Sequence, residues 1–312
     1  MAELNHFAIA AGMGATLGPT VTVHHGQIGC AQMAATISDL LHRRQLLVDD
    51  LNPQDGITRK YEKSVTRAFL MSREEFSLDR VLADPRLDGR FIEACRDLGL
   101  EGSEFHLNMA LIGLRKHNKL KAKSKPSRVP DQWRYAVASE IAARMMFYQY
   151  GASVDTTLAH PALVREFDKL AAAIAPGFSS FEYRWAALNM RKKGANVKLK
   201  PKDIDGLDWS RHVRFDAWQL MPADEGVYTL FEEKTCLYVA GTENIHDSIE
   251  SQQRITGVLN SELWRPNPER LSWQYVRMPD SNSDYRFGVV RSLVGRWEPV
   301  FNIPRGREKK VA

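Results

Sequence analysis

Two stretches of this chain decide its fold: LDRVLADPRLDGRFIEACRDLGLEGSEFHLNMALIGLRKHNKL (Leu78–Leu120) and VDTTLAHPALVREFDKLAAAIAPGFSSFEYRWAALNMRKKGAN (Val154–Asn196). Placed one above the other at an offset of 76 residues, they align without a gap and share eleven identities over 43 positions. The identities include an early Asp, a Leu-Ala-x-Pro step and a closing Arg-Lys pair. Chance similarity between two helical segments is the alternative, but the gapless register and the shared proline step favour an internal duplication.

Each copy is predicted to be helical. In the first copy, Leu87, Phe91 and Cys95 recur every four residues, which places them on one face of a helix. A serine then stands where a longer helix can begin, Ser103 in the first copy and Ser179 in the second. Serine is a preferred residue at a helix N-cap, so both copies are expected to start their last helix there.

A further helix is expected upstream of each copy, over Thr58–Met71 and Gln132–Tyr150. Each module then holds three or so helices, the last of which runs into basic residues. A small helical bundle with a basic final helix is typical of helix-turn-helix-like DNA-binding modules. A paired-helix scaffold for a protein partner is the alternative.

Positive charge is concentrated after the two copies. The chain has 43 Lys and Arg against 38 Asp and Glu, but thirteen of the basic residues lie in two segments without any acid, Arg115–Arg128 and Arg191–Lys202. Without these thirteen, 30 basic residues face 38 acidic ones, a net charge of −8. Unpaired charges are too costly to bury, so the segments predict an exposed surface that attracts polyanions, with a solvated lysine-rich loop as the alternative. The candidate nucleic-acid-binding residues are Arg115, Lys116, Lys119, Lys121, Lys123, Lys125, Arg128, Arg191, Lys192, Lys193, Lys198, Lys200 and Lys202.

The last hundred residues have a different character. Asp203–Ala223 is predicted to be an irregular linker. Two β-rich runs, Gly226–Phe231 and Cys236–Gly241, flank a charged turn, which is the pattern of a hairpin. By residue type, Leu271–Met278 is a third strand and Asp284–Trp297 a helix.

This C-terminal part resembles the GIY-YIG nuclease domain over about 221–303. The resemblance is carried by Gly226-Val227-Tyr228, by Tyr238-Val239-Ala240 and by a terminal Pro299-x-x-Asn302. In that family helices flank a small three-stranded sheet, a tyrosine activates water, an arginine stabilises charge, a glutamate holds one divalent metal and an asparagine orders the site. The resemblance implies, as candidate catalytic residues, Tyr228, Tyr238 and Asn302, with His246 as a nearby substitute.

Two family positions are replaced in this chain. Ser248 stands where the family has its arginine, and Val290 stands where it has the metal-binding glutamate. A valine has no ligand atom, and the charge that develops on a cleaved phosphate then lacks a counter-charge worth on the order of several kcal/mol. The domain is therefore expected to be catalytically degenerate unless other residues take over. The residues that can do so are His246, Arg254, Glu262 and Glu298.

Composition limits the remaining classes of protein. A hydrophobic share of 44% and a charged share of 26% are ordinary for a globular chain. Three cysteines far apart, Cys30, Cys95 and Cys236, predict neither a disulfide framework nor a cysteine-built zinc site. No run approaches the ~20 apolar residues of a membrane helix, and the N-terminus lacks the basic start of a secretory signal. A cytoplasmic protein without a membrane partner is expected.

The sequence thus predicts an α+β protein. Two tandem, mostly helical modules of helix-turn-helix-like type precede a small GIY-YIG-like domain with a three-stranded sheet flanked by helices. The expected parts are an N-terminal helical or loop segment at 1–55, module 1 at 56–130, module 2 at 131–206, the GIY-YIG-like domain at 207–303 and a basic tail at 304–312.

The leading functional hypothesis is a nucleic-acid-binding protein without a cofactor, with double-stranded DNA as the expected partner. The first alternative is an active endonuclease with relocated catalytic residues, which would use Mg²⁺ or Mn²⁺. The second alternative is a protein-interaction scaffold, in which the partners are other protein subunits. The settings in which GIY-YIG domains usually occur suggest a mobile element or phage defence.

Overall fold

The computed structural model describes residues 59–120, 122–126, 129, 131–190, 197, 199–253 and 267–303. The chain divides after Asp39 into two units, and all described residues lie in the second, Leu40–Ala312. The expected N-terminal segment at 1–55 and the basic tail at 304–312 lie outside the described residues.

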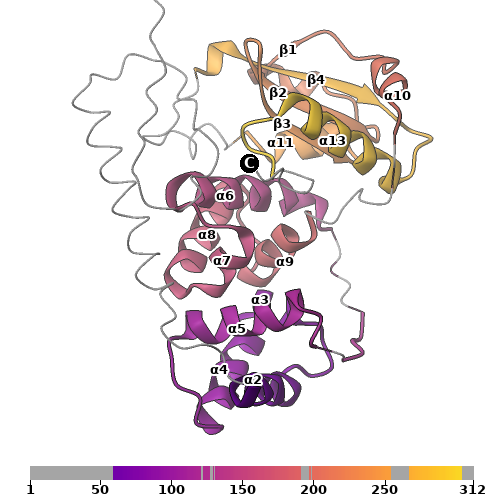
Figure 1. The fold of residues 1–312 in the computed structure, drawn as a ribbon. Coiled ribbons are helices and arrows are strands. Elements are labelled where there is room, and N and C mark those ends of the chain that lie inside the picture. Colours follow the sequence, from indigo (N-terminus) through magenta and orange to yellow (C-terminus); the bar gives the residue numbers. More distant parts are fainter. Residues whose placement is uncertain are drawn as a thin grey trace, which may run out of the picture. The chain divides into compact units, whose positions relative to one another are not determined.

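The described chain has the predicted α+β class, with helices first and an antiparallel sheet after them (Figure 1). Module 1 consists of α2 (Arg59–Ser72), α3 (Leu78–Ala83), α4 (Pro85–Asp97) and α5 (Glu104–Lys116). Module 2 consists of α6 (Trp133–Tyr150), α7 (Val154–Ala159), α8 (Pro161–Ile174) and α9 (Ser180–Met190). The last three helices of each module begin 76 residues apart, which is the offset of the sequence alignment.

The same capping chemistry starts equivalent helices. Ser77 and Ser153 accept a hydrogen bond from the third residue of α3 and α7. Ser103 and Ser179 do the same for α5 and α9, at 3.3 Å in both cases. Each cap satisfies one backbone N–H that has no partner inside the helix, so the shared serines fix where the helices begin.

The two modules pack by exchanging equivalent surfaces. Helix α3 packs against α9, and α5 against α7, so the contacts of one module are repeated by the other. Ala83 of module 1 lies in a buried cluster with Leu158 and Leu188 of module 2, and its counterpart Ala159 lies in the core of module 1. The shared Leu-Ala-x-Pro step therefore lies at this interface, which has the reciprocal contacts of an isologous dimer.

The sheet domain follows module 2. Its helices are α10 (Pro201–Asp205), η1 (Phe215–Leu220), α11 (Ile245–Glu250), η2 (Pro268–Arg270) and α13 (Ser283–Trp297), and its strands are β1 (Val213–Arg214), β2 (Gly226–Glu232), β3 (Thr235–Thr242) and β4 (Leu271–Arg277). The strand order is β1-β4-β2-β3, and every pair is antiparallel.

Two sequence predictions for this region are wrong. The sheet has four strands rather than three, because Val213 and Arg214 pair with Trp273 and Ser272 of β4. The stretch Asp203–Ala223, predicted to be an irregular linker, holds β1, η1 and part of α10. A two-residue strand and helices of five or six residues are too short to show a periodic pattern in the sequence.

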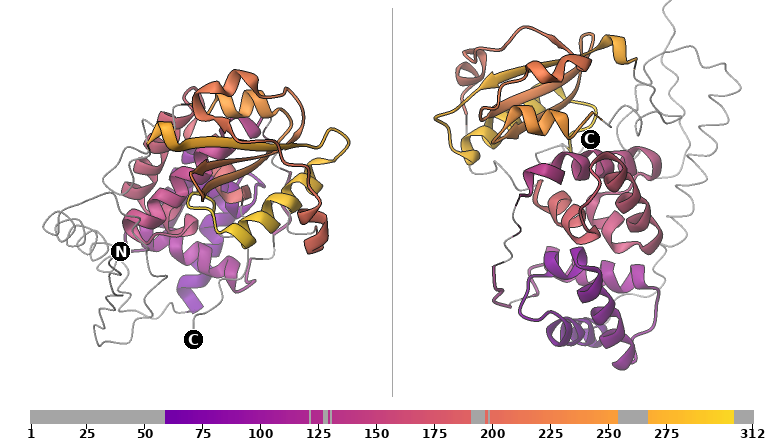
Figure 2. Two further views of the ribbon diagram at one scale, coloured as in Figure 1. Left: turned by 90° about the horizontal axis from the view of Figure 1, so that it is seen from above. Right: turned by 180° about the vertical axis from the view of Figure 1, so that it is seen from behind.

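Both faces of the sheet are covered by helices. Side chains alternate along a strand, so neighbouring residues of β2 enter different cores. Val227 packs with residues of α13 and α10, whereas Tyr228 packs with residues of α6, α8 and α11. The views in Figure 2 show α13 lying along the sheet. Module 2 and the sheet domain thus share one hydrophobic core.

Within the described ranges, no helix combines the length and the apolar character that a bilayer span requires.

Candidate functional site

Tyr228, the tyrosine of the first family-like motif, lies in β2 and is fully buried. Its hydroxyl lies 2.8 Å from the hydroxyl of Ser248 and accepts a hydrogen bond from the amide of Gln252. Burial raises the pKa of Tyr228 above its ordinary value, although Ser248 and Gln252 oppose the shift. A phenol without access to solvent and with a raised pKa is poorly suited to activate water.

The glycine before this tyrosine has a packing role. A Cβ atom at Gly226 would lie 2.2 Å from the carbonyl oxygen of Val276 and 2.7 Å from the side chain of Ile245. Only a residue without a side chain permits β2 to approach β4 and α11 this closely. The Gly-Val-Tyr motif therefore has a structural explanation in this chain that does not involve catalysis.

Tyr238, in β3, is also fully buried, and its hydroxyl donates to the carboxylate of Glu140 at 2.7 Å. Glu140 comes from α6 of module 2, is itself completely buried, and also accepts a hydrogen bond from the backbone N–H of Ile303 at 3.0 Å. Sequence reasoning missed Glu140. The signal was a single carboxylate in the otherwise apolar or small-residue stretch Tyr135–Met146.

Asn302 closes the outer edge of the sheet. Its side-chain amide accepts from the N–H of Val239 at 2.8 Å and donates to the carbonyl of Val239 at 2.9 Å. The preceding residues Val300 and Phe301 donate their N–H groups to carbonyls of β3. An exposed strand edge is a template for unwanted pairing, so this segment protects β3.

The two replaced family positions come together but offer no ligand. Ser248 and Val290 are buried, at 2% and 1% exposure. With Tyr238 they line a cavity of about 20 Å³ that is roofed by Trp133 and Val137 of α6. This volume holds about one water molecule, and a phosphodiester does not fit.

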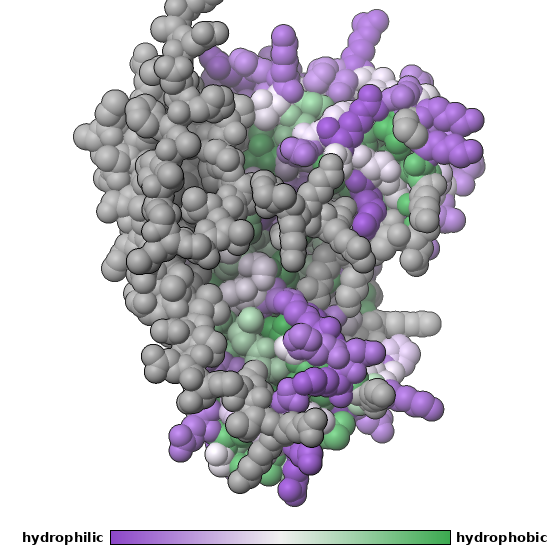
Figure 3. Space-filling view, viewed as in Figure 1, coloured by the Kyte–Doolittle hydropathy of each residue, from purple (hydrophilic) through white to green (hydrophobic). Residues whose placement is uncertain are grey.

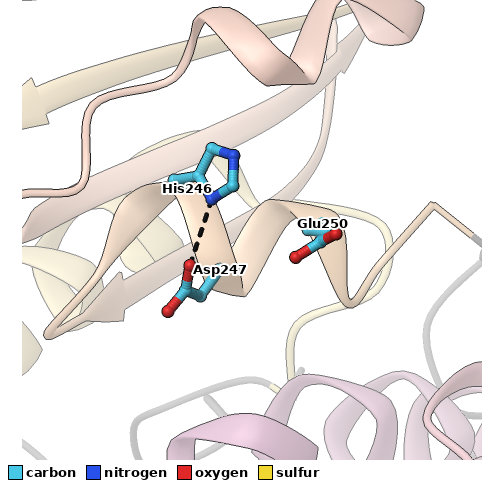
Figure 4. Close-up of side chains that lie close together, drawn as sticks. All are labelled: His246, Asp247 and Glu250. Carbon is cyan, nitrogen blue, oxygen red and sulfur yellow. Dashed lines mark hydrogen bonds and ion pairs between the residues drawn. The ribbon is translucent and has the colours of Figure 1, made fainter.

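His246, the fourth candidate, lies on α11 beside two carboxylates (Figure 4). One ligand atom each from His246, Asp247 and Glu250 lies within 4.8 Å of the others. The Nδ1 atom of His246 is 3.1 Å from Oδ1 of Asp247, and the ring contacts Trp218 at 5.3 Å between centroids. One imidazole and two carboxylates are ligand types that Zn²⁺ and Mn²⁺ accept.

The other residues considered as substitutes do not join this group in the described structure. Glu298 lies at the C-terminal end of α13, with a left-handed backbone (φ +47°). Arg254 and Glu262 lie outside the described residues.

The first basic residues predicted to contact nucleic acid instead face carboxylates of this chain. Arg115 pairs with Asp79 of its own module and, at 2.9 Å, with Asp155 of module 2. The two carboxylates raise the pKa of Arg115, although desolvation acts in the opposite direction. The prediction of exposed positive surface is wrong here, because Asp79 and Asp155 reach Arg115 only through the fold.

Lys116 and Lys119 are partly exposed and also have acidic partners. The Nζ atom of Lys116 is 3.3 Å from Asp155, and that of Lys119 contacts Glu62. Further along, the side chains of four lysines are exposed: Lys123, Lys125, Lys200 and Lys202. The remaining candidates lie outside the described residues: Lys121, Arg128, Arg191, Lys192, Lys193 and Lys198.

No known family, characterised protein or solved structure matches this chain. The likeness to a GIY-YIG domain therefore depends on the quoted residues alone.

Proposed function

We propose that this protein binds nucleic acid, with double-stranded DNA as the expected partner, and that its sheet domain does not cleave it. The observation that carries the second part is the placement of Tyr228 and Tyr238. Both hydroxyls are buried and hydrogen-bonded inside the protein, to Ser248 and Gln252 in one case and to Glu140 in the other.

The GIY-YIG-like domain is then a structural part that has kept the motif residues for packing. A nuclease of that type needs a hydroxyl, a metal ion and a cation around the phosphate. Val290 offers no metal ligand, and the cavity beside it is too small for a phosphodiester. With α6 packed on this face of the sheet, substrate cannot reach either tyrosine.

Support for binding comes from the charge distribution. The chain outside the two basic segments has a net charge of −8, so the segments are set apart from the rest of the sequence. Of their described lysines, Lys123, Lys125, Lys200 and Lys202 have exposed side chains. Figure 3 shows hydrophilic side chains projecting from the helical modules and the sheet domain on the face in view. Two small helical bundles beside such segments have the general architecture of helix-turn-helix-like modules.

The test is the salt dependence of duplex binding, measured by fluorescence anisotropy of a labelled DNA. Each neutralised phosphate contributes about 0.9 to the slope of log affinity against log salt. The variants Lys123→Ala/Lys125→Ala and Lys200→Ala/Lys202→Ala are each expected to lower the slope by about 1.8.

The matched control is Lys63→Ala/Lys169→Ala, which removes two exposed lysines outside the basic segments. This control is expected to leave the slope nearly unchanged. An equal decrease in all three variants would show a general charge effect and contradict the assignment. A wild-type protein that binds no duplex would contradict the proposal and favour the scaffold alternative.

The second candidate function is a divalent-metal-dependent endonuclease, and the group of His246, Asp247 and Glu250 favours it. Incubation of supercoiled plasmid with the protein and Mn²⁺ or Mg²⁺ separates the two functions. We expect no nicking. Nicking that requires metal and is lost in His246→Ala, but not in His212→Ala, would establish the endonuclease and overturn the non-cleaving proposal.

A further inference from the structure

A carboxylate and two arginines form a compact group on module 1, outside both basic segments. Glu74, in the turn between α2 and α3, accepts hydrogen bonds from Arg86 through both carboxylate oxygens, at 2.6 and 3.0 Å. Arg90 also donates to Glu74. Arg86 and Arg90 are four residues apart on α4 and therefore lie on the same face of the helix.

A lysine from the first basic segment joins this group. The backbone N–H of Lys125 donates to the carbonyl of Glu75 at 2.9 Å, and its Nζ atom lies 3.9 Å from the centre of the Phe76 ring. A cation over an aromatic ring is attracted to its face and keeps N–H donors available on the outer side. The pKa of Glu74 is lowered, mainly by its hydrogen bond with Arg86 and also by the charges of Arg86, Arg90 and Lys125.

The turn that holds Glu74 has an unusual backbone. Glu74 and Glu75 both have positive φ values, +47° and +67°, which residues with a Cβ atom rarely adopt. Arg73 holds the turn and the basic segment together, because its guanidinium donates to the carbonyls of Glu75 and Lys123. The carboxylate of Glu74 is thus fixed in the place where it aligns the two arginines.

The group remains positive when all of its charges are counted. Asp84 pairs with Arg80 at 3.5 Å, and Glu75 is exposed beside the same turn. The cations are Arg73, Arg80, Arg86, Arg90 and Lys125, and the carboxylates are Glu74, Glu75 and Asp84. The side chains of Arg86 and Arg90 are 56% and 45% exposed, so both have guanidinium surface that a ligand can reach.

We propose that Arg86, Arg90 and Lys125 form a phosphate-binding site, in which Glu74 holds the two arginines in position. The site rests on the proposed function, and its ligand is a phosphate group of the nucleic-acid backbone. Arginine suits this role because its planar guanidinium binds phosphate oxygens through two parallel hydrogen bonds. Arginines already fixed by a carboxylate lose less conformational freedom on binding than mobile ones.

The first test compares two double variants that remove the same charge. Arg86→Ala/Arg90→Ala removes the site, and Arg214→Ala/Arg270→Ala removes two exposed arginines of the sheet domain that also pair with carboxylates. Because the first variant no longer neutralises two phosphates, its slope of log affinity against log salt is expected to fall by about 1.8. Affinity at 0.1 M salt then falls about 60-fold, while the control changes little. Equal decreases in both variants, or no decrease in the first, would overturn the site.

The second test does not require DNA binding. Inorganic phosphate is titrated into the full chain while the arginine Nε–H signals are followed by NMR. The signals of Arg86 and Arg90 are expected to shift with saturation, and those of Arg214 and Arg270 are not. If the protein binds no DNA but these signals shift, the proposed function fails and the site stands. If DNA binds and the signals of Arg86 and Arg90 do not shift with phosphate, the site fails alone.

Discussion

At the scale of single residues, Arg115 shows how a charge that looks free in the sequence can be structural. It lies between Asp79 and Asp155, which occupy equivalent positions in the two modules. The carboxylate side chains of Asp79 and Asp155 are only 11% and 7% exposed, so they depend on Arg115 for compensation. Removal of one partner of a buried ion pair leaves an uncompensated charge, which is costly.

We therefore predict that Arg115→Ala lowers the free energy of unfolding by about 2 kcal/mol, a value below that of a fully buried pair because Arg115 is partly exposed. Urea denaturation followed by circular dichroism measures this change. The slope of DNA affinity against salt is expected to stay as in the wild type. A reduced slope with unchanged stability would instead restore Arg115 as a phosphate contact.

Asp88, on α4, gives stability a pH dependence. Burial raises its pKa from 3.8 to about 7, although Asn108 and the charge of Arg184 oppose the shift. Its Oδ1 atom is buried and has no hydrogen-bond partner among the described residues, while the residue as a whole is half-buried. The folded protein thus favours the neutral carboxylic acid at this position.

The sign of the effect follows from proton binding. Between about pH 4 and 7 the folded chain holds a proton on Asp88 that the unfolded chain has released, so stability falls as pH rises through this range. The contribution is fully present below about pH 4 and is lost above about pH 7. We predict that Asp88→Asn removes a decrease on the order of 2–4 kcal/mol. Urea midpoints of both proteins at pH 5 and 8 measure it, and parallel pH curves would contradict it.

At the scale of elements, α6 joins two parts of the molecule. One side of the helix packs in the core of module 2, through Ala142 and Met146. The other side packs against the sheet, through Val137, Ile141 and Met145. Sequence reasoning placed this helix correctly within one residue at its start, but a helix that is apolar on two sides does not indicate which neighbour each side meets.

Because α6 contributes to both cores, the sheet domain and module 2 are expected to unfold together. Ile141→Ala removes a side chain that is 1% exposed and should destabilise the protein by about 3 kcal/mol. The measurement is thermal unfolding by calorimetry, in which one transition should contain both parts and move to lower temperature. A separate, unshifted transition for the sheet domain would contradict the shared core.

Leu199 shows why the packing around the sheet was hard to foresee. It is a half-buried residue of the second basic segment that packs with Val227 and Val289 of the sheet domain. The hairpin of β2 and β3 was predictable from its β-rich runs and polar turn. The strand β1 was not, since its position depends on Trp273 and Ser272, which lie about sixty residues away in the chain.

At the scale of the whole molecule, duplication explains how the described helices are arranged. The offset of 76 residues was visible in the sequence, and the structured helices begin at that spacing. The reciprocal packing of α3 with α9 and of α5 with α7 was not visible, because an alignment of two copies contains no information on how they meet. The carboxylates of Asp79 and Asp155 were recognised as identities in the alignment, but their role as partners of Arg115 emerged only in three dimensions.

The candidate catalytic residues show the same limit. The sequence identified Tyr228, Tyr238 and Asn302 as a group related to a nuclease motif. It also identified the loss of chemistry at Ser248 and Val290. That both tyrosines lie beneath α6 could not be foreseen, because the contact with Glu140 joins residues 98 positions apart.

The central claim is that the chain holds a nucleic-acid backbone through exposed cations. It is tested most directly by the affinity of the wild-type protein for a DNA duplex across a series of salt concentrations. If Lys123, Lys125, Lys200 and Lys202 each neutralise one phosphate, log affinity should fall with log salt at a slope of at least about −3.6. A slope near zero, or affinity too weak to measure at low salt, would contradict the account.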